Sequence, residues 1–173
     1  MTVKPIITIP NKLLEDPTEK VGEITDYIKD VASHLMDTVL KAKDPEGAGL
    51  SANQIGVNKK MCVVRNFYKD PKTGNENSED TILINPKVIS HSNETEMGWE
   101  GCLSVPDTYG QVPRFKKLKV KAKGLDGKKI RITASGYFAR VIQHELDHLN
   151  GILFTERVQG KTITEEELEK LFV

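Results

Sequence analysis

The clearest periodic pattern in the chain is an apolar stripe near the N-terminus. Apolar residues recur there at intervals of three or four, at Ile24, Ile28, Val31, Leu35 and Val39. This spacing places them on one face of an α-helix and predicts an N-terminal helix of about 20 residues. Asp44, Pro45 and Gly47 follow the stripe and predict where the helix ends.

Other segments have the patterns of β-strands. Residues 60–64 and 81–90 contain β-branched runs bounded by turn residues and are predicted to be strands. The polar residues 69–81 between them predict a surface loop. Apolar residues and lysines alternate over 118–122, and an Asp-Gly turn leads into a second alternating segment, 129–133, which together predict a β-hairpin.

Two further helices are expected in the C-terminal third. Ser135 is a plausible N-cap, and Gly151 stands where a helix would end, so the segment between them is predicted to be helical. Thr164 and Glu167 have capping-box spacing and predict a short acidic helix within residues 162–172. The strand signals do not alternate with helices, so we expect an α+β fold in which antiparallel strands surround the second helix, with the N-terminal helix packed outside.

Composition narrows the classes of protein to consider. The 173 residues are a typical length for one domain, which we place at residues 1–173. The chain has 25 basic residues (Lys plus Arg) and 25 acidic residues (Asp plus Glu), so it has no overall positive field that would attract nucleic acid. The lysines of the predicted hairpin are interpreted as the solvent-exposed face of a sheet. No apolar run approaches the ~18 residues of a membrane span, and no leader pattern is evident. Two cysteines are too few for a disulfide framework, which favours the cytoplasm.

The predicted second helix contains a metal-binding pattern. His144 and His148 are one helical turn apart, so both imidazoles lie on one face, where two nitrogens can bind one ion. Glu145 is offset by about 100°, which lets its carboxylate reach a water molecule instead of the ion. Cys102, in the segment EGCLS, is the candidate third ligand. An ion with three protein ligands retains a position for water, which attacks the substrate while Glu145 serves as base and acid.

Three segments together resemble the signature motifs of the peptide deformylases. They are GAGLSANQ at 47–54, EGCLS at 100–104 and QHELDHLNG at 143–151. The resemblance implies removal of the N-formyl group from the N-terminal formylmethionine of newly made polypeptides, with release of formate. It also implies one divalent metal ion per chain, natively Fe(II), with zinc, nickel or cobalt as possible substitutes.

The resemblance implies a role for each matching residue. It makes Cys102, His144 and His148 the metal ligands and Glu145 the catalytic base and acid. It makes the Gln54 side-chain amide and the Leu103 backbone N–H the groups that stabilise the oxyanion. The extended substrate then pairs like a β-strand with the backbone near Ala48, Gly49 and Gly101.

The chain also departs from common family patterns. Ser51 and Asn53 replace the usual alanine and the frequent proline of the first motif. Tyr109 stands where many bacterial members have an arginine that contacts the peptide tail of the substrate. The acidic C-terminal segment differs from the basic extension with which some bacterial members dock on the ribosome, so any ribosome association is expected to be transient.

Two other classes of protein remain alternatives. The two histidines and the glutamate are also the signature of zincin metallopeptidases, whose third ligand lies downstream, and Glu165 to Glu167 offer such a ligand. That alternative leaves EGCLS and GLSANQ unexplained. A non-catalytic module with a closed metal site is the second alternative, but such a site normally has a fourth protein ligand and no use for Glu145.

Overall fold

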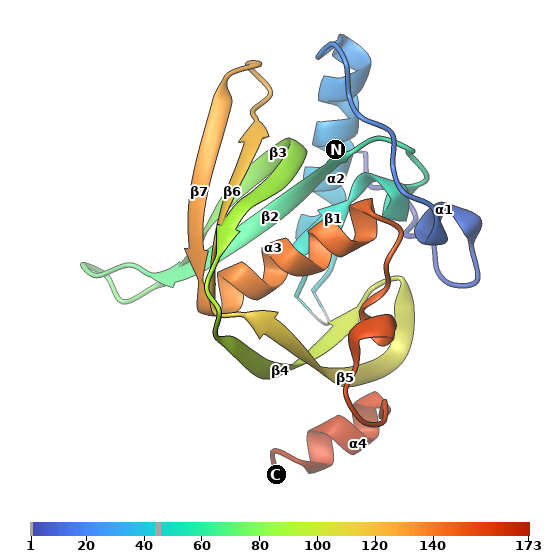
Figure 1. Ribbon diagram of the computed structural model, residues 1–173, viewed down its shortest axis with the longest axis vertical. Coiled ribbons are helices and arrows are strands. Elements are labelled where there is room, and N and C mark those ends of the chain that lie inside the picture. Colours follow the sequence, from blue (N-terminus) through green and yellow to red (C-terminus); the bar gives the residue numbers. More distant parts are fainter. Residues whose placement is uncertain (1, 44–45) are drawn as a thin grey trace.

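The computed structural model describes residues 2–43 and 46–173 (Figure 1). Its helices are α1 (Lys12–Glu15), α2 (Asp26–Lys41), α3 (Gly136–Leu149) and α4 (Glu165–Lys170), with 3-10 turns η1 (Ala52–Ile55) and η2 (Phe154–Arg157). Its strands are β1 (Gly49–Ser51), β2 (Met61–Lys69), β3 (Glu76–His91), β4 (Thr95–Cys102), β5 (Val105–Phe115), β6 (Lys117–Lys123) and β7 (Lys129–Ser135).

The strands form two antiparallel sheets around one helix. The larger sheet has the order β1-β2-β3-β6-β7, and the smaller consists of β4 and β5. Helix α3 runs between the two sheets, and its contacts extend to β1 and β2 on one side and to β5 on the other (Figure 1). Helix α2 packs on the opposite face of the larger sheet. The predicted α+β arrangement around a central helix is therefore confirmed.

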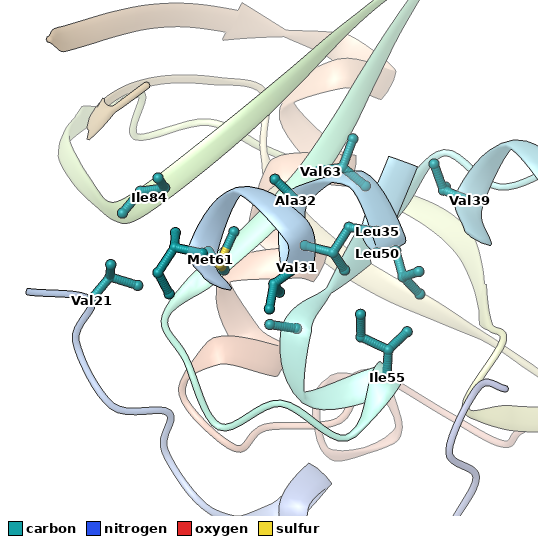
Figure 2. Packing of buried hydrophobic residues seen from close by; sticks show 12 residues of the cluster. Val21, Val31, Ala32, Leu35, Val39, Leu50, Ile55, Met61, Val63 and Ile84 are labelled. Carbon is teal, nitrogen blue, oxygen red and sulfur yellow. The ribbon is translucent and has the colours of Figure 1, made fainter. Parts of the chain in front are cut away.

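The central strand β2 is buried on both faces because each face is covered by a helix. Met61 and Val63 point to the side of α2, where they join a cluster with Leu35 of that helix (Figure 2). Cys62 and Val64 point to the opposite side and pack in the cluster that contains α3. Alternate residues of a strand face opposite sides of a sheet, so a strand covered on both sides is apolar at every position.

The helices begin and end close to where the sequence predicts. Helix α2 has 16 residues and buries its apolar stripe, while Ile24 lies before its first turn. Asp44 and Pro45, which were expected to end this helix, lie outside the described residues. The short acidic helix is confirmed as α4, whose N-cap Thr164 accepts a hydrogen bond from Glu167 N. Among the described residues, no helix combines the length and the apolar character needed to cross a membrane.

The hairpin was predicted correctly, whereas the loop at 69–81 was wrong in part. β6 and β7 pair as predicted, and the lysines of β6 alternate with its buried residues. The residues predicted as a polar loop instead continue β2 and β3 into a ribbon that turns only at 70–75, and this ribbon includes a cross-strand pair between Arg65 and Asp80. Backbone pairing and opposite charges hold such a ribbon together without an apolar period.

Two other parts of the fold show no alternation of apolar and polar residues in the sequence. β4 and β5 were not predicted as strands, and the glycine-rich loop at 47–56 contains β1 and η1. β1 pairs with β2, with Gly49 opposite Val64. Short or glycine-containing strands offer too few side chains for an alternation to be visible.

Candidate active site

Helix α3 carries His144, Glu145 and His148 into the space between the two sheets. The helix begins after Ser135, which occupies the N-cap position through extended backbone, without a side-chain capping hydrogen bond. It ends before Gly151, whose φ of +73° favours glycine. A Cβ at Gly151 would lie 2.5 Å from the backbone oxygen of Glu15. Any side chain at this position would therefore clash with the backbone of Glu15.

The third candidate ligand lies at the tip of the β4–β5 hairpin. Cys102 is the last residue of β4, pairs with Val105 and is separated from it by a two-residue turn. This turn brings the Cys102 sulfur to 3.1 Å from His148 Nε2. Ligand atoms of Cys102, His144 and His148 all lie within 4.8 Å of one another, so the hairpin and α3 together form a possible metal site.

The electrostatics of this group fit a divalent cation. Burial raises the pKa of the Cys102 thiol, but the neighbouring imidazoles of His148 and His144 outweigh burial and hold that pKa well below its usual value. Burial lowers the pKa of His144, whereas hydrogen bonds with Cys102 and Glu100 raise it well above its usual value. A thiolate is the form of cysteine that binds metals. The Cys102 thiolate therefore favours a neighbouring positive charge. Without metal, a proton on His144 provides this charge, and a bound metal ion would replace that proton.

His144 is oriented by a buried carboxylate. Its Nδ1 lies 2.9 Å from Glu100 Oε2, which leaves Nε2 facing the ligand group. Glu100 in turn accepts hydrogen bonds of 2.8 and 2.9 Å from Arg114 and one of 2.8 Å from Arg140. Such partners fix the ring orientation of a metal-binding histidine.

Asp147 belongs to the same buried charge network and not to the ligand group. Its carboxylate accepts one hydrogen bond from Arg114 and two from Arg157, of 2.6 and 2.8 Å. The structure places it at 7% exposure, where it links α3 to β5 and η2.

Glu145 is buried and held by strand β1. Ser51 Oγ donates a hydrogen bond of 2.6 Å to Glu145 Oε2. On its other side the carboxylate abuts Gly49, where a Cβ would lie 2.6 Å from Glu145 Oε1. Burial raises the pKa of Glu145, and this effect is opposed by His144, His148 and the Ser51 hydroxyl. A base with a raised pKa takes up protons more readily near neutral pH.

The two unusual residues of the first motif both contact α3. Besides the Ser51 hydrogen bond to Glu145, Asn53 Nδ2 donates one of 2.7 Å to the backbone oxygen of His148. Asn53 also reaches Leu13 O at 3.1 Å. These polar replacements therefore tie the loop to the helix that carries the histidines.

Gln54 is fixed with its amide N–H directed at the ligand group. Its Oε1 accepts a hydrogen bond of 2.9 Å from Ser51 N, and its Nε2 donates to Ser104 Oγ at 3.0 Å and approaches Cys102 Sγ at 3.6 Å. Leu103 lies in the turn beside Cys102 and lines the same cavity. Both groups expected to stabilise an oxyanion thus lie beside the candidate ligands.

One cavity of about 270 Å³ opens onto these residues. Ala48, Gly49 and Gly101, the residues expected to pair with an extended substrate, all line it, as do Cys102 and Glu145. β1 is an edge strand of the larger sheet, and β4 belongs to a sheet of two strands. Among the residues that the structure describes, each of these two strands therefore has one edge that is not paired with another strand of its sheet.

Comparison with known proteins identifies the family. The model of the family described as polypeptide deformylase matches residues 3–163. The chain belongs to the polypeptide deformylase family. The match includes the residues of all three motifs that line or support the cavity.

Individual deformylases resemble the chain over nearly its whole length. A peptide deformylase of Thermomicrobium roseum is 40% identical over 162 residues, which is 94% of this chain and 89% of the relative. Peptide deformylase 1 of Bacillus subtilis is 39% identical over 168 residues, which is 97% of both chains. A solved structure of class I type b peptide deformylase from Acinetobacter baumannii, bound to Met-Ala-Ser, superposes with a TM-score of 0.80 at 32% identity and covers 91% of this chain and 99% of that one.

Replacing Ser51 with alanine is expected to slow the deformylase reaction and to leave the metal content unchanged. The substitution removes the hydroxyl that donates to Glu145 but keeps the backbone N–H that holds Gln54. Loss of one hydrogen bond to a charged group predicts a fall in kcat of about 10-fold. Formate release and metal analysis would measure both quantities. Ser33→Ala, an exposed serine on α2, is the control, and equal kcat in the two variants would contradict this role.

The metal-free protein is expected to lose stability as the pH falls from about 4.5 towards 2. Burial raises the pKa of Glu100, but hydrogen bonds from Arg114 and His144 outweigh burial and lower it to about 2. A lowered folded-state pKa contributes stability above the unfolded-state pKa, and this contribution disappears as the carboxylate is protonated. The shift corresponds to about 3 kcal/mol. Urea unfolding of the wild type and of Glu100→Gln from pH 6 to 2.5 tests this, and parallel curves would contradict it.

Proposed function

We propose that the chain removes the N-formyl group from the N-terminal formylmethionine of newly made polypeptides and releases formate. The observation that carries this proposal is the convergence of the Cys102, His144 and His148 ligand atoms beside a cavity that Glu145 and Gln54 line. The family comparison supports the same reaction. The reaction is hydrolysis of a formamide, which needs a base, an acid and donors for an oxyanion.

We assign Cys102, His144 and His148 as the ligands of one divalent ion. One thiolate and two imidazoles suit Fe(II) as well as zinc, nickel or cobalt, and we propose Fe(II) as the native ion from the family resemblance. When bound, such an ion supplies Lewis acidity that lowers the pKa of water and polarises the formyl oxygen. Glu100 holds His144 for this role through the contact at Nδ1.

Glu145 is the residue that we assign to proton transfer. Its carboxylate takes the proton of the attacking water and delivers it to the amine that leaves when the formamide C–N bond breaks. Ser51 keeps one carboxylate oxygen in place during both transfers. The Gln54 Nε2–H and the Leu103 backbone N–H stabilise the negative charge that develops on the formyl oxygen.

The substrate is proposed to lie extended between the free edges of β1 and β4. Backbone groups of Ala48, Gly49 and Gly101 line the cavity there, and pairing through backbone groups tolerates many peptide sequences. The Acinetobacter baumannii relative was solved with Met-Ala-Ser bound, which supports a peptide with N-terminal methionine as the ligand of this chain too.

Several expectations from the sequence stay proposals. We propose that residues 1–173 act as one catalytic domain in the cytoplasm. Nascent formylated peptides are its partners, and contact with the ribosome is transient. We propose no specific binding of nucleic acid and no membrane partner.

The proposal is tested by formate release from formyl-Met-Ala-Ser by protein purified anaerobically and analysed for metal. We expect formate in proportion to the metal bound and no cleavage of internal peptide bonds. Cleavage of an internal bond in an unformylated peptide, without formate release, would favour the zincin alternative. In the described residues, however, Cys102 completes the ligand group, and the carboxylate of Glu165 is hydrogen-bonded by Tyr109.

A further inference from the structure

A buried arginine of the larger sheet reaches the segment that leads into β1. Arg65, in β2, is 6% exposed, and its Nη1 donates a hydrogen bond of 2.9 Å to the backbone oxygen of Gly47. The same nitrogen donates one of 3.2 Å to Glu46 Oε1. The backbone N–H of Arg65 donates a third, of 2.9 Å, to Ala48 O. One residue of β2 therefore contacts three successive residues, 46–48, all of which line the cavity.

The rest of the Arg65 guanidinium is fixed by the ribbon of β2 and β3. Its Nε donates a hydrogen bond of 3.1 Å to Asp80 Oδ1, and its Nη2 donates one of 3.1 Å to Ser78 Oγ. The guanidinium carbon lies 4.8 Å from the centre of the Phe67 ring. A guanidinium is planar, and its N–H donors have fixed directions. Because the ribbon fixes this plane, it also fixes the direction in which Nη1 meets Gly47.

The same segment packs closely against α2. A Cβ at Gly47 would lie 2.7 Å from the backbone oxygen of Val39, so this residue has no room for a side chain. Gly47 N donates a hydrogen bond of 3.1 Å to Ala42 O, which follows α2. Glycine has more backbone freedom than any other residue, so contacts with neighbouring elements must define its conformation. These contacts come from α2 and from Arg65.

We propose that Arg65 is a positioning residue for substrate binding, which fixes the backbone of residues 46–48 so that the edge at Ala48 and Gly49 is ordered before the peptide arrives. The role rests on the proposed deformylase function. A binding edge that is already ordered loses less conformational entropy when a ligand binds. Arg65 does not itself line the cavity, so it acts through this backbone and does not touch the substrate.

Arg65→Lys tests the role with steady-state kinetics and hydrogen exchange on the metal-loaded protein. An ammonium group balances the charge of Asp80, but it lacks the planar fork that joins Ser78 to Gly47. For formyl-Met-Ala-Ser we expect KM to rise about tenfold, the effect of losing one hydrogen bond from a charged group, with kcat and metal content unchanged. Such a change indicates weaker substrate binding. Without substrate, the amides of residues 46–51 should exchange faster than in the wild type.

Three further variants separate positioning from stability. Ser78→Ala is a milder change that removes the acceptor of Nη2, and KM should rise about two- to threefold. Arg131→Lys makes the same substitution at an exposed arginine of β7 and should behave as the wild type. Val120→Ala creates a cavity in β6, which does not pair with β1 or β2. It should lower the melting temperature and leave KM and the exchange of residues 46–51 unchanged.

The outcomes distinguish this role from the function on which it rests. Wild-type KM in Arg65→Lys overturns the role, and so does unchanged exchange of residues 46–51. An equal rise in KM in Val120→Ala would attribute the effect to lower stability and would overturn the role as well. Absence of formate release by the metal-loaded wild type would instead refute the proposed function, and with it the role in substrate binding, whatever the exchange shows.

Discussion

Cys102→Ala is expected to leave the protein unable to retain its metal ion. The two histidines that remain come from one helix, and the thiolate that brings negative charge to the group is gone. Loss of an outer hydrogen-bond partner already costs about 10- to 100-fold in metal affinity, so removal of a ligand should exceed ~100-fold. Formate release should fall to the level of metal-depleted wild type. Metal analysis after anaerobic purification and desalting measures the effect directly.

The second cysteine provides the matched control. Cys62 is fully buried in β2 and packs in the cluster that contains α3, but it does not belong to the ligand group. Cys62→Ala should lose about 1 kcal/mol of stability through the small cavity that it creates, and should bind one ion per chain. Metal at full stoichiometry in Cys102→Ala would refute the assigned ligand set.

The parts of the site that are close in sequence were predictable from local pattern alone. His144, Glu145 and His148 share one helix, and the helical period fixes which of them share a face. Cys102 and Gln54 come from other segments, and no period relates them to α3. Cys102 was proposed as the third ligand from its residue type and its setting in EGCLS, whereas only the resemblance of three motifs to a known family predicted that Gln54 lies beside it. Neither contact follows from a local pattern, because convergence depends on how the β4–β5 hairpin packs against the helix.

The smaller sheet shows why some elements could not be predicted. Its glycines lie where a neighbouring side chain occupies the space of a Cβ: Arg140 at Gly98, Tyr109 at Gly101 and Val158 at Gly110. These glycines interrupt the alternation by which a strand is recognised. Glycine is required at these positions by contacts with side chains that are distant in sequence, so neighbouring residues in the sequence do not reveal the requirement.

The supporting polar network was missed for a related reason. Glu100 and Arg114 are charged residues, which in a sequence favour the surface, yet they are 6% and 5% exposed here. They are buried because each is the other's partner. Ser51 was noted only as a departure from an alanine pattern, and its hydrogen bond to Glu145 follows from the packing of the loop against α3.

Glu145→Gln is expected to abolish turnover while the metal ion and the fold are retained. The amide has the same shape and keeps an oxygen that can accept the Ser51 hydrogen bond. It cannot take a proton from water or return one to the leaving amine, so kcat should fall by about 10²- to 10⁴-fold. KM should change little, because the residues proposed to bind the peptide backbone are unaltered.

Three measurements distinguish loss of proton transfer from loss of the site. Metal content should equal that of the wild type, since Glu145 is not one of the three residues whose ligand atoms converge. The melting temperature should not fall, because an uncharged amide is less costly to bury than a carboxylate whose pKa is raised by burial. Glu169→Gln, an exposed glutamate of α4, should retain full kcat and serves as the control. Wild-type turnover by Glu145→Gln, with metal bound, would overturn the assignment of Glu145 as base and acid.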